Sequence, residues 1–188
     1  MFDDAIKALL KPGGVGVIPT DTVYGLVARA EDQQAVARAY QLKSRDSKPA
    51  PVIAASVAQL VGLGLKARYL KPVEQYWPGP VSVIIPHDLA YLSQGVGAQP
   101  FRLPNNKQLI ELLERTGPLV ASSANLPGQP VANTLSQVKA YFGDQVDFYV
   151  DGGDLSKNLP STIIRIIDDA IEVVREGAVK IADNGKIT

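Results

Sequence analysis

The chain contains no cysteine and only one histidine, His87, among its 188 residues. The missing thiols exclude disulfides, cysteine nucleophiles, zinc ribbons and iron–sulfur clusters. A single imidazole excludes a metal site built from several histidines, and any Ser-His-Asp triad would have to use His87. His87 stands between a proline and an aspartate after an apolar run, so we expect it to be a solvated loop residue.

No stretch of the sequence has the length and apolarity of a membrane span. The uncharged run over residues 49–65 has 17 residues and is interrupted by prolines and glycines, whereas a spanning helix needs about 20 apolar residues. The first residues, Met1-Phe2-Asp3-Asp4, are acidic where a secretion signal is basic. We therefore expect a soluble, cytoplasmic protein with no membrane partner.

The chain also carries no net charge, because 19 basic residues balance 19 acidic ones. A net charge of zero argues against a histone-like nucleic-acid binder. The charges are distributed unevenly, with a local +5 over residues 40–72 and a local −5 over residues 144–176. Either these are chance patterns on solvated surfaces, or the basic stretch faces an anion.

Capping residues and hydrophobic periodicity predict alternating helices and strands in a single domain over residues 1–188. Strands are expected at 15–18, 51–55, 81–85, 119–122 and 146–150, with a hairpin of 162–167 and 170–175. Helices are expected at 3–10, from 32, at 56–62, around 72, and at 106–117 and 134–143. The alternation indicates a layered α/β or α+β protein, and the terminal hairpin favours a mixed sheet.

Four short polar segments follow apolar runs: Thr20-Asp21-Thr22, Lys43-Ser44-Arg45, Ser122-Ser123-Ala124-Asn125 and Ser161-Thr162. Ligands of open α/β sheets collect at the carboxyl ends of strands, and hydroxyl, amide and cationic donors suit phosphate or carboxylate oxygens. Each segment also has a structural explanation as a polar turn, solvated charge, a helix cap or a strand residue. Their co-occurrence is what favours a site.

The residues available limit the chemistry. Without a thiol, a second imidazole or an obvious carboxylate pair, catalysis would rest on positioning and on electrostatic stabilisation of anions. Phosphoryl or nucleotidyl transfer fits that requirement. The sequence contains no Gly-x(4)-Gly-Lys-Ser/Thr loop, so any nucleotide is held without a Walker A motif.

One set of motifs resembles a known family, the YrdC/TsaC threonylcarbamoyl-AMP synthases in their short, single-domain form. Order and spacing agree from about residue 5 to residue 180. The motifs are Pro19-Thr20-Asp21-Thr22-Val23-Tyr24-Gly25-Leu26, Lys43-Ser44-Arg45, Trp77-Pro78-Gly79-Pro80, Phe101-Arg102-Leu103-Pro104, Ser122-Ser123-Ala124-Asn125 and Ser161-Thr162-Ile163-Ile164.

The resemblance implies a nucleotidyltransferase that combines L-threonine, bicarbonate or carbon dioxide, and ATP into threonylcarbamoyl-adenylate and pyrophosphate. A transferase complex would then use the adenylate to modify tRNA. The implied fold is a twisted mixed sheet with flanking helices around a basic cavity. Mg²⁺ would arrive with ATP and need no dedicated protein ligands, and some members of the family bind double-stranded RNA or tRNA.

The resemblance also implies roles for individual residues. Thr20, Thr22, Arg102, Ser122 and Ser161 would bind threonine. The phosphates of ATP would be held by the catalytic cations Lys43 and Arg45, and the rest of the nucleotide would be contacted by Ser123, Asn125 and Arg175. Two alternatives remain: a non-catalytic RNA-binding module of the same fold, and a carbamoyl-transfer module like those within hydrogenase-maturation proteins.

Overall fold

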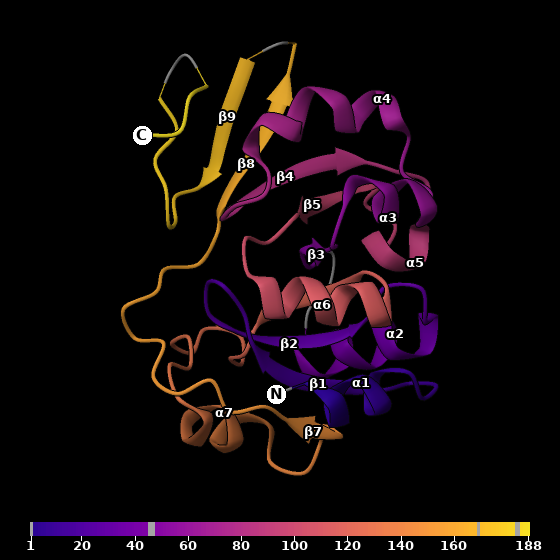
Figure 1. Ribbon diagram of the computed structural model, residues 1–188, viewed down its shortest axis with the longest axis vertical. Coiled ribbons are helices and arrows are strands. Elements are labelled where there is room, and N and C mark those ends of the chain that lie inside the picture. The colour runs from indigo at the N-terminus through magenta and orange to yellow at the C-terminus, as the bar shows by residue number, and fades with distance from the viewer. Residues whose placement is uncertain (1, 45–47, 169, 183–184) are drawn as a thin grey trace.

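The fold is built on one mixed sheet of nine strands (Figure 1), in a computed structural model that describes residues 2–44, 48–168, 170–182 and 185–188. Parallel pairs join β1 to β7, β3 to β5 and β4 to β8, and the other neighbours are antiparallel. The order across the sheet is β7 (Phe148–Tyr149), β1 (Val15–Pro19), β2 (Tyr24–Arg29), β6 (Leu119–Ser123), β3 (Val52–Ile53), β5 (Ala98–Arg102), β4 (Val81–Pro86), β8 (Thr162–Ile167), β9 (Ala170–Arg175). The predicted mixed α/β sheet is confirmed.

Four helices begin where their capping residues predict, whereas the cap expected from Asp3 or Asp4 is wrong, because α1 begins after Phe2 without a side-chain cap. The side chains of Asp32, Ser56, Asn106 and Thr134 each accept a hydrogen bond from the backbone N–H three residues on, which satisfies a donor left free at a helix start. The helices are α1 (Asp3–Leu9), α2 (Gln33–Leu42), α3 (Val57–Gly62), α4 (Ala67–Leu70), the 3₁₀ turn η1 (Lys71–Tyr76), α5 (Ala90–Ser93), α6 (Lys107–Thr116) and α7 (Leu135–Phe142). None of those in the described ranges is long and apolar enough to cross a bilayer.

Two strands, β2 and β5, were not predicted from the sequence. The hydrophobic run of β2 begins inside the Thr-Asp-Thr-Val-Tyr-Gly motif, where the polar residues indicate a turn. β5 contains Pro100, which usually marks a sheet edge. Here β3 pairs with β5 only from Phe101 onward, so the missing N–H of Pro100 leaves that ladder intact. The predicted strand at 146–150 is shorter than expected and covers only Phe148–Tyr149.

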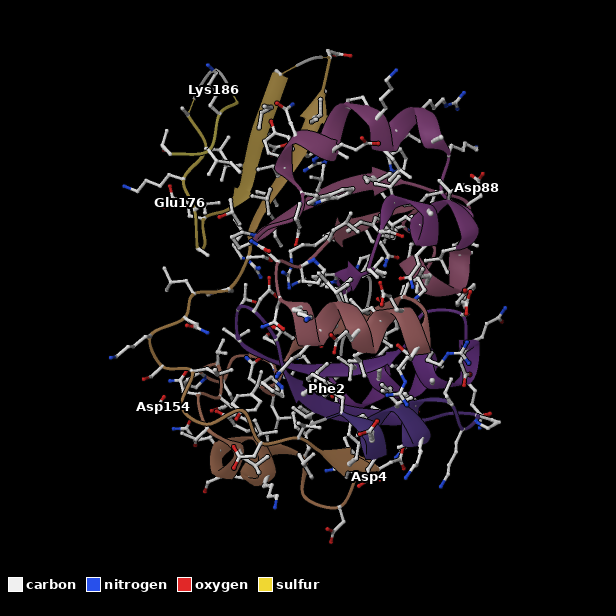
Figure 2. The ribbon with its side chains drawn as sticks, in the orientation of Figure 1. Phe2, Asp4, Asp88, Asp154, Glu176 and Lys186 are labelled. Atoms are coloured by element: carbon white, nitrogen blue, oxygen red, sulfur yellow. The ribbon has the colours of Figure 1, made fainter. Side chains whose placement is uncertain are left out.

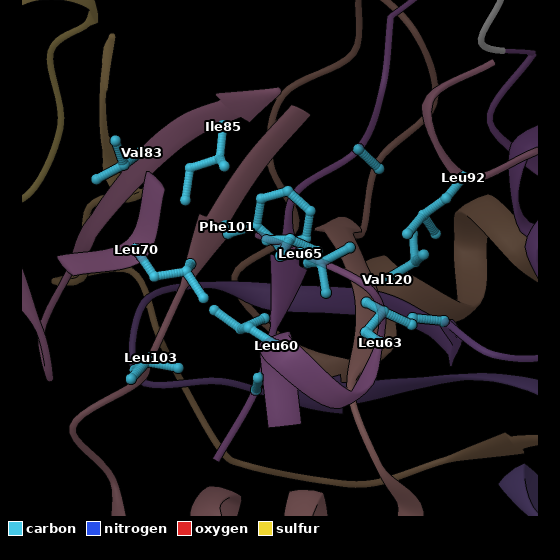
Figure 3. Close-up of a cluster of buried hydrophobic side chains, with 14 of the residues drawn as sticks. Leu60, Leu63, Leu65, Leu70, Val83, Ile85, Leu92, Phe101, Leu103 and Val120 are labelled. Atoms are coloured by element: carbon cyan, nitrogen blue, oxygen red, sulfur yellow. The ribbon is translucent and has the colours of Figure 1, made fainter. Parts of the chain in front are cut away.

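One face of the sheet is covered along most of its length. Helices α2 and α7 pack on the β1–β2 end, and α3, α4, η1 and α5 pack on the β6–β8 end. The larger cluster surrounds Phe101, with Leu60, Leu65, Leu70 and Val83 among the side chains that converge on it (Figure 3). Side chains at alternate strand positions, such as Val81, Val83 and Ile85 of β4, supply the sheet side of this core.

The opposite face is covered only in part. Helices α1 and α6 bury it over β1, β2, β6 and β3, through Ile6, Leu9, Leu109, Leu112 and Leu113. The other strand positions of β4, β5 and β8 also face this side, and they include Ser82, Arg102 and Ile163. No helix among the described residues packs over that part of the sheet. A polar site can therefore form there.

The expectation that His87 is solvated was wrong. His87 is 6% exposed, and its ring packs edge-on against Phe101 with the centroids 5.5 Å apart. Nδ1 accepts a hydrogen bond from Leu89 N (3.2 Å), so the neutral ring carries its proton on Nε2 and donates to Gln99 Oε1 (3.1 Å). The loop after β4 is folded back over the core by this ring.

We predict that His87 makes the fold sensitive to mild acid. Burial lowers its pKa in the folded protein, so the unfolded chain binds more protons as the pH falls below about 6.5. The stabilising contribution is complete above that pH and is lost as the pH falls toward the folded-state pKa, by about 1.4 kcal/mol per unit of pKa difference. Urea unfolding of wild type and His87→Gln from pH 7.5 to 5 measures this.

The wild-type free energy of unfolding should fall more steeply over this range than that of His87→Gln, which cannot take up the proton. Parallel pH profiles for the two proteins would show that His87 does not couple to folding.

Candidate functional site

The uncovered part of the sheet holds a narrow hollow of about 80 Å³. Its walls come from the β1–β2 turn, the ends of β5 and β6, and the segments at the start of β8 and the end of β9. Seven of the residues predicted from the sequence line it together: Thr20, Thr22, Arg102, Ser122, Ser123, Ser161 and Arg175. They lie up to 155 positions apart in the chain, from residue 20 to residue 175.

Arg102 is the most deeply buried cation of this hollow. Its Nη1 donates to both carboxylate oxygens of Asp21, at 2.7 and 2.6 Å, and the two side chains are 5% and 10% exposed. Asp21 Oδ2 also accepts from the backbone N–H of Asn105 (3.3 Å). Within the described part of the chain, the Nε–Nη2 edge of Arg102 makes no hydrogen bond. That edge offers two parallel N–H donors, which is the geometry that a carboxylate accepts.

The Thr20-Asp21-Thr22 turn presents acceptors to the hollow. Thr20 Oγ1 donates its single proton to Val23 O (2.7 Å), so in the 3.0 Å contact between the two hydroxyls Thr22 must be the donor. Thr20 Oγ1 also accepts from Thr22 N (3.1 Å). Both hydroxyl protons are used within the turn. Thr20 Oγ1 also uses both lone pairs within the turn, so a ligand would find the free oxygen lone pairs on Thr22 Oγ1.

A second, wider hollow of about 470 Å³ lies on the other side of Ser123. Its walls are formed by Lys43, Ser44, Lys48, Ser123, Asn125, Pro127 and Gly128, so Ser123 lines both hollows. Lys43 is 6% exposed, and its ammonium donates to Ser123 O (2.8 Å), Asn125 Oδ1 (3.1 Å) and Asn125 O. Arg45, predicted to act beside it, lies outside the described residues.

The two hollows are basic. Arg102 and Arg175 line the first, Lys43 and Lys48 line the second, and no acidic side chain lines either one in the described ranges. Lys66 and Arg68 of the basic stretch lie elsewhere: Lys66 pairs with Asp88 (2.9 Å), and Arg68 sits over the ring of Tyr69. Only part of the stretch over residues 40–72 therefore faces the site.

The acidic stretch over residues 144–176 lies largely outside the site. Figure 2 shows Asp154 and Glu176 at the outer edge of the molecule, and both residues are exposed. Asp147, in contrast, accepts from Arg38 (2.7 Å) and from Val15 N (2.8 Å), and so ties α2 to β1. These acidic groups have structural or solvated positions.

Arg175 is fixed to Ser161. Its Nε and Nη2 donate to Ser161 O at 3.2 and 2.6 Å, and Nη2 also contacts Ser161 Oγ at 3.2 Å. The structure therefore places Arg175, for which the family resemblance implies contact with the nucleotide, in the narrow hollow beside Ser161, for which it implies contact with the amino acid.

Tyr24 anchors the segment that carries Ser161 to the hollow. Its buried hydroxyl accepts from Gly152 N (2.8 Å) and donates to Gly153 O (2.9 Å), and burial raises its pKa so that it stays protonated. A Cβ on Gly152 would lie 2.3 Å from Pro19 Cβ, so only glycine allows this approach. This segment, residues 150–161, runs from β7 toward β8 (Figure 1).

Sequence reasoning missed two parts of this arrangement. Asp21 was noted only within its motif, and its role as the partner of Arg102 requires the loop after β1 to meet the end of β5, a strand that was not predicted. Tyr24 and Gly152 are 128 residues apart. A Tyr within an apolar strand and a Gly-Gly pair carry no signal that they meet.

The comparisons with known proteins agree with this geometry. The model of the Sua5/YciO/YrdC family, described as "Telomere recombination", matches residues 8–177. A protein of Mycobacterium leprae is 34% identical over 93% of this chain and 82% of its own length. The threonylcarbamoyl-AMP synthase of Pseudomonas aeruginosa is 33% identical over 82% of this chain and 87% of its own.

Solved structures agree in fold. The crystal structure of Pyrococcus abyssi Sua5 complexed with L-threonine superposes with a TM-score of 0.83 at 26% identity, over 95% of this chain. This chain spans only 54% of that longer protein. The match over nearly the whole chain, together with the basic hollow on the open face of a mixed sheet, shows that this chain belongs to the Sua5/YciO/YrdC family.

Proposed function

We propose that this chain, as a single YrdC-like domain over residues 1–188, is an L-threonylcarbamoyladenylate synthase. It joins L-threonine, bicarbonate or carbon dioxide, and ATP into threonylcarbamoyl-adenylate, and releases pyrophosphate. The observation that carries the proposal is the pairing of two sites: an arginine edge free to bind a carboxylate lies in one hollow, and a lysine suited to phosphate lines the next, with Ser123 lining both.

Threonine binds in the narrow hollow. Its carboxylate accepts from the Nε–Nη2 edge of Arg102, which Asp21 holds in place from the other side. The lone pairs of Thr22 Oγ1 accept from the amino acid, whose amine and hydroxyl are both donors, and Thr20 Oγ1 holds the Thr22 hydroxyl in place by accepting its proton. Ser122 and Ser161 complete the walls.

ATP binds in the wider hollow. Lys43, with Arg45, holds its phosphates, while Ser123 and Asn125 contact the nucleotide. The Lys43 ammonium already donates to three oxygens of residues 123–125. A phosphate oxygen of ATP therefore replaces one of these oxygens as its hydrogen-bond acceptor. Mg²⁺ fits here as an ion carried on the ATP phosphates, because no group of three or more acidic or imidazole side chains suited to a metal lies within the described ranges.

The chemistry proceeds in two steps and needs no protein nucleophile. The amine nitrogen of threonine bonds to the carbon of carbon dioxide and loses a proton, giving a carbamate; with bicarbonate the same bond forms as a C–O bond breaks and water leaves. A carbamate oxygen then attacks the α-phosphorus, and the bond to the β-phosphate oxygen breaks as pyrophosphate leaves. The protein holds the reactants together and neutralises the charge that develops on the phosphate oxygens.

The product is a mixed anhydride for a tRNA-modifying transferase complex, which we place with this enzyme in the cytoplasm. Direct binding of tRNA or double-stranded RNA stays a prediction. A purely RNA-binding module would show RNA affinity that falls steeply with salt and no heat of ATP binding.

We predict that Lys43→Gln abolishes threonine-dependent pyrophosphate release from ATP in bicarbonate buffer. The amide retains donors for the carbonyls of residues 123–125 but has no charge for the phosphates. A loss of about 100-fold or more is expected for such a group, and the same loss is expected for Arg45→Ala. Lys7→Ala is the matched control, because Lys7 is exposed and its ion pair within the described residues is with Asp4, at the surface.

Threonine-independent pyrophosphate release by the wild type, or full activity of a folded Lys43→Gln variant, would contradict the proposed function. Thermal unfolding of each variant establishes that it is folded.

We predict that Arg102→Lys raises the KM for threonine and leaves the KM for ATP unchanged. Lysine keeps the charge but cannot present two parallel donors. Loss of one charge-assisted hydrogen bond costs about 1.5 to 3 kcal/mol, which corresponds to roughly a 10- to 100-fold rise in KM. Steady-state kinetics with each substrate varied in turn measures this, and Arg115→Lys, at an exposed surface pair, is the control. A rise confined to the KM for ATP would place Arg102 in the nucleotide site instead.

A further inference from the structure

A buried hydroxyl of the sheet lies directly behind the threonine site. Ser82 is the second residue of β4, between Val81 and Val83, and it is 0% exposed. Its neighbours on the strand point into the hydrophobic core, whereas Ser82 faces the uncovered side of the sheet. In the described ranges it has one side-chain hydrogen-bond partner, Ser161 Oγ at 3.0 Å.

The protons of this contact can be assigned. Ser161 Oγ accepts from Nη2 of Arg175. If Ser161 donated to Ser82, the Ser82 proton would be buried without an acceptor, at a cost of about 1 to 3 kcal/mol. With Ser82 as the donor, the proton of the fully buried Ser82 is satisfied. Ser161 Oγ then accepts two hydrogen bonds, and its own proton is left for the hollow that it lines.

We propose that Ser82 is a positioning residue for the amino-acid substrate: together with Arg175 it fixes the Ser161 hydroxyl as a donor to the threonine carboxylate. This rests on the proposed function. Arg102 supplies two donors to the carboxylate, and Ser161 supplies a third from another wall of the same hollow. Since Ser82 does not line the hollow, it acts only through Ser161.

The backbone supports the same geometry. β4 and β8 are parallel neighbours, with Val81 opposite Thr162 and Ser82 opposite Ile163. Thr162 N donates to Pro80 O (2.9 Å), which holds the start of β8 against the start of β4. The two serines are therefore brought together by strand pairing, and Arg175 reaches Ser161 from β9, where it pairs with Ile163.

The test is a double-mutant cycle on the KM for threonine. We expect Ser82→Ala to raise this KM about 5-fold, because Ser161 can then turn its proton to other acceptors, with the KM for ATP unchanged. Ser161→Ala should raise it by at least as much. The double variant Ser82→Ala/Ser161→Ala should match Ser161→Ala alone, because Ser82 has no effect without Ser161. Multiplicative effects in the double variant would overturn the inference, as would an unchanged KM in Ser82→Ala.

Ser93→Ala is the matched control for the loss of a buried serine. Ser93 is also 0% exposed and hydrogen-bonded, but it lies in the α5 region and does not line the hollow. Its variant should lower the unfolding temperature and leave the KM for threonine at the wild-type value. Ser82→Thr, which keeps the hydroxyl, should also retain a KM close to wild type; a rise equal to that of Ser82→Ala would count against the proposal.

Two further measurements separate the possible failures. If Ser82→Ala does not fold, Ser82→Cys replaces it, since a thiol is a weak donor of similar shape, and the same rise in KM is expected. If wild type shows no threonine-dependent pyrophosphate release, the proposed function fails. Calorimetric titration of wild type and Ser82→Ala with L-threonine alone then tests the inference, which predicts weaker binding by the variant and is overturned by equal affinities.

Discussion

The buried ion pair between Arg102 and Asp21 connects the end of β5 to the loop after β1. Three strands, β2, β6 and β3, lie between β1 and β5 in the sheet. A guanidinium that is 5% exposed is costly to desolvate unless its donors are satisfied. Asp21 satisfies one end and leaves the other facing the hollow. The pair thus stabilises the closure of two loops and also orients the edge that binds a carboxylate, so fold and recognition depend on the same contact.

The remaining polar groups of the narrow hollow are also fixed by hydrogen bonds within the protein. Thr20 and Thr22 use their protons within the turn, and Thr22 presents an acceptor, whereas Ser161 receives hydrogen bonds from Ser82 and Arg175 and presents a donor. An amino acid carries acceptors at one end and donors at the amine and hydroxyl. The hollow therefore has a built-in direction for its ligand, set by groups that do not all touch it.

The sequence predicted the helix starts well, because a capping side chain and its N–H partner are three residues apart. It failed where the deciding partner is distant. β2 needs β1 and β6 on either side, and His87 is buried by a loop that folds back onto Phe101. For the site, residue chemistry alone suggested only polar strand ends with structural alternatives. The motif resemblance selected the residues, and only the structure pairs Asp21 with Arg102 and Ser82 with Ser161.

A reaction without a protein nucleophile depends on side chains that are held rigidly in place, and the structure shows how they are held. Catalysis by positioning requires groups that do not reorganise when charge develops, and such groups must be held by others. Here Lys43 is held by the carbonyls of residues 123–125, Arg102 by Asp21, and Ser161 by Arg175. Each holding contact lies within the protein, away from the reacting atoms. Substitutions at these supports should therefore change substrate affinity selectively, and the reaction itself remains the one that bound threonine and ATP undergo when they are brought together.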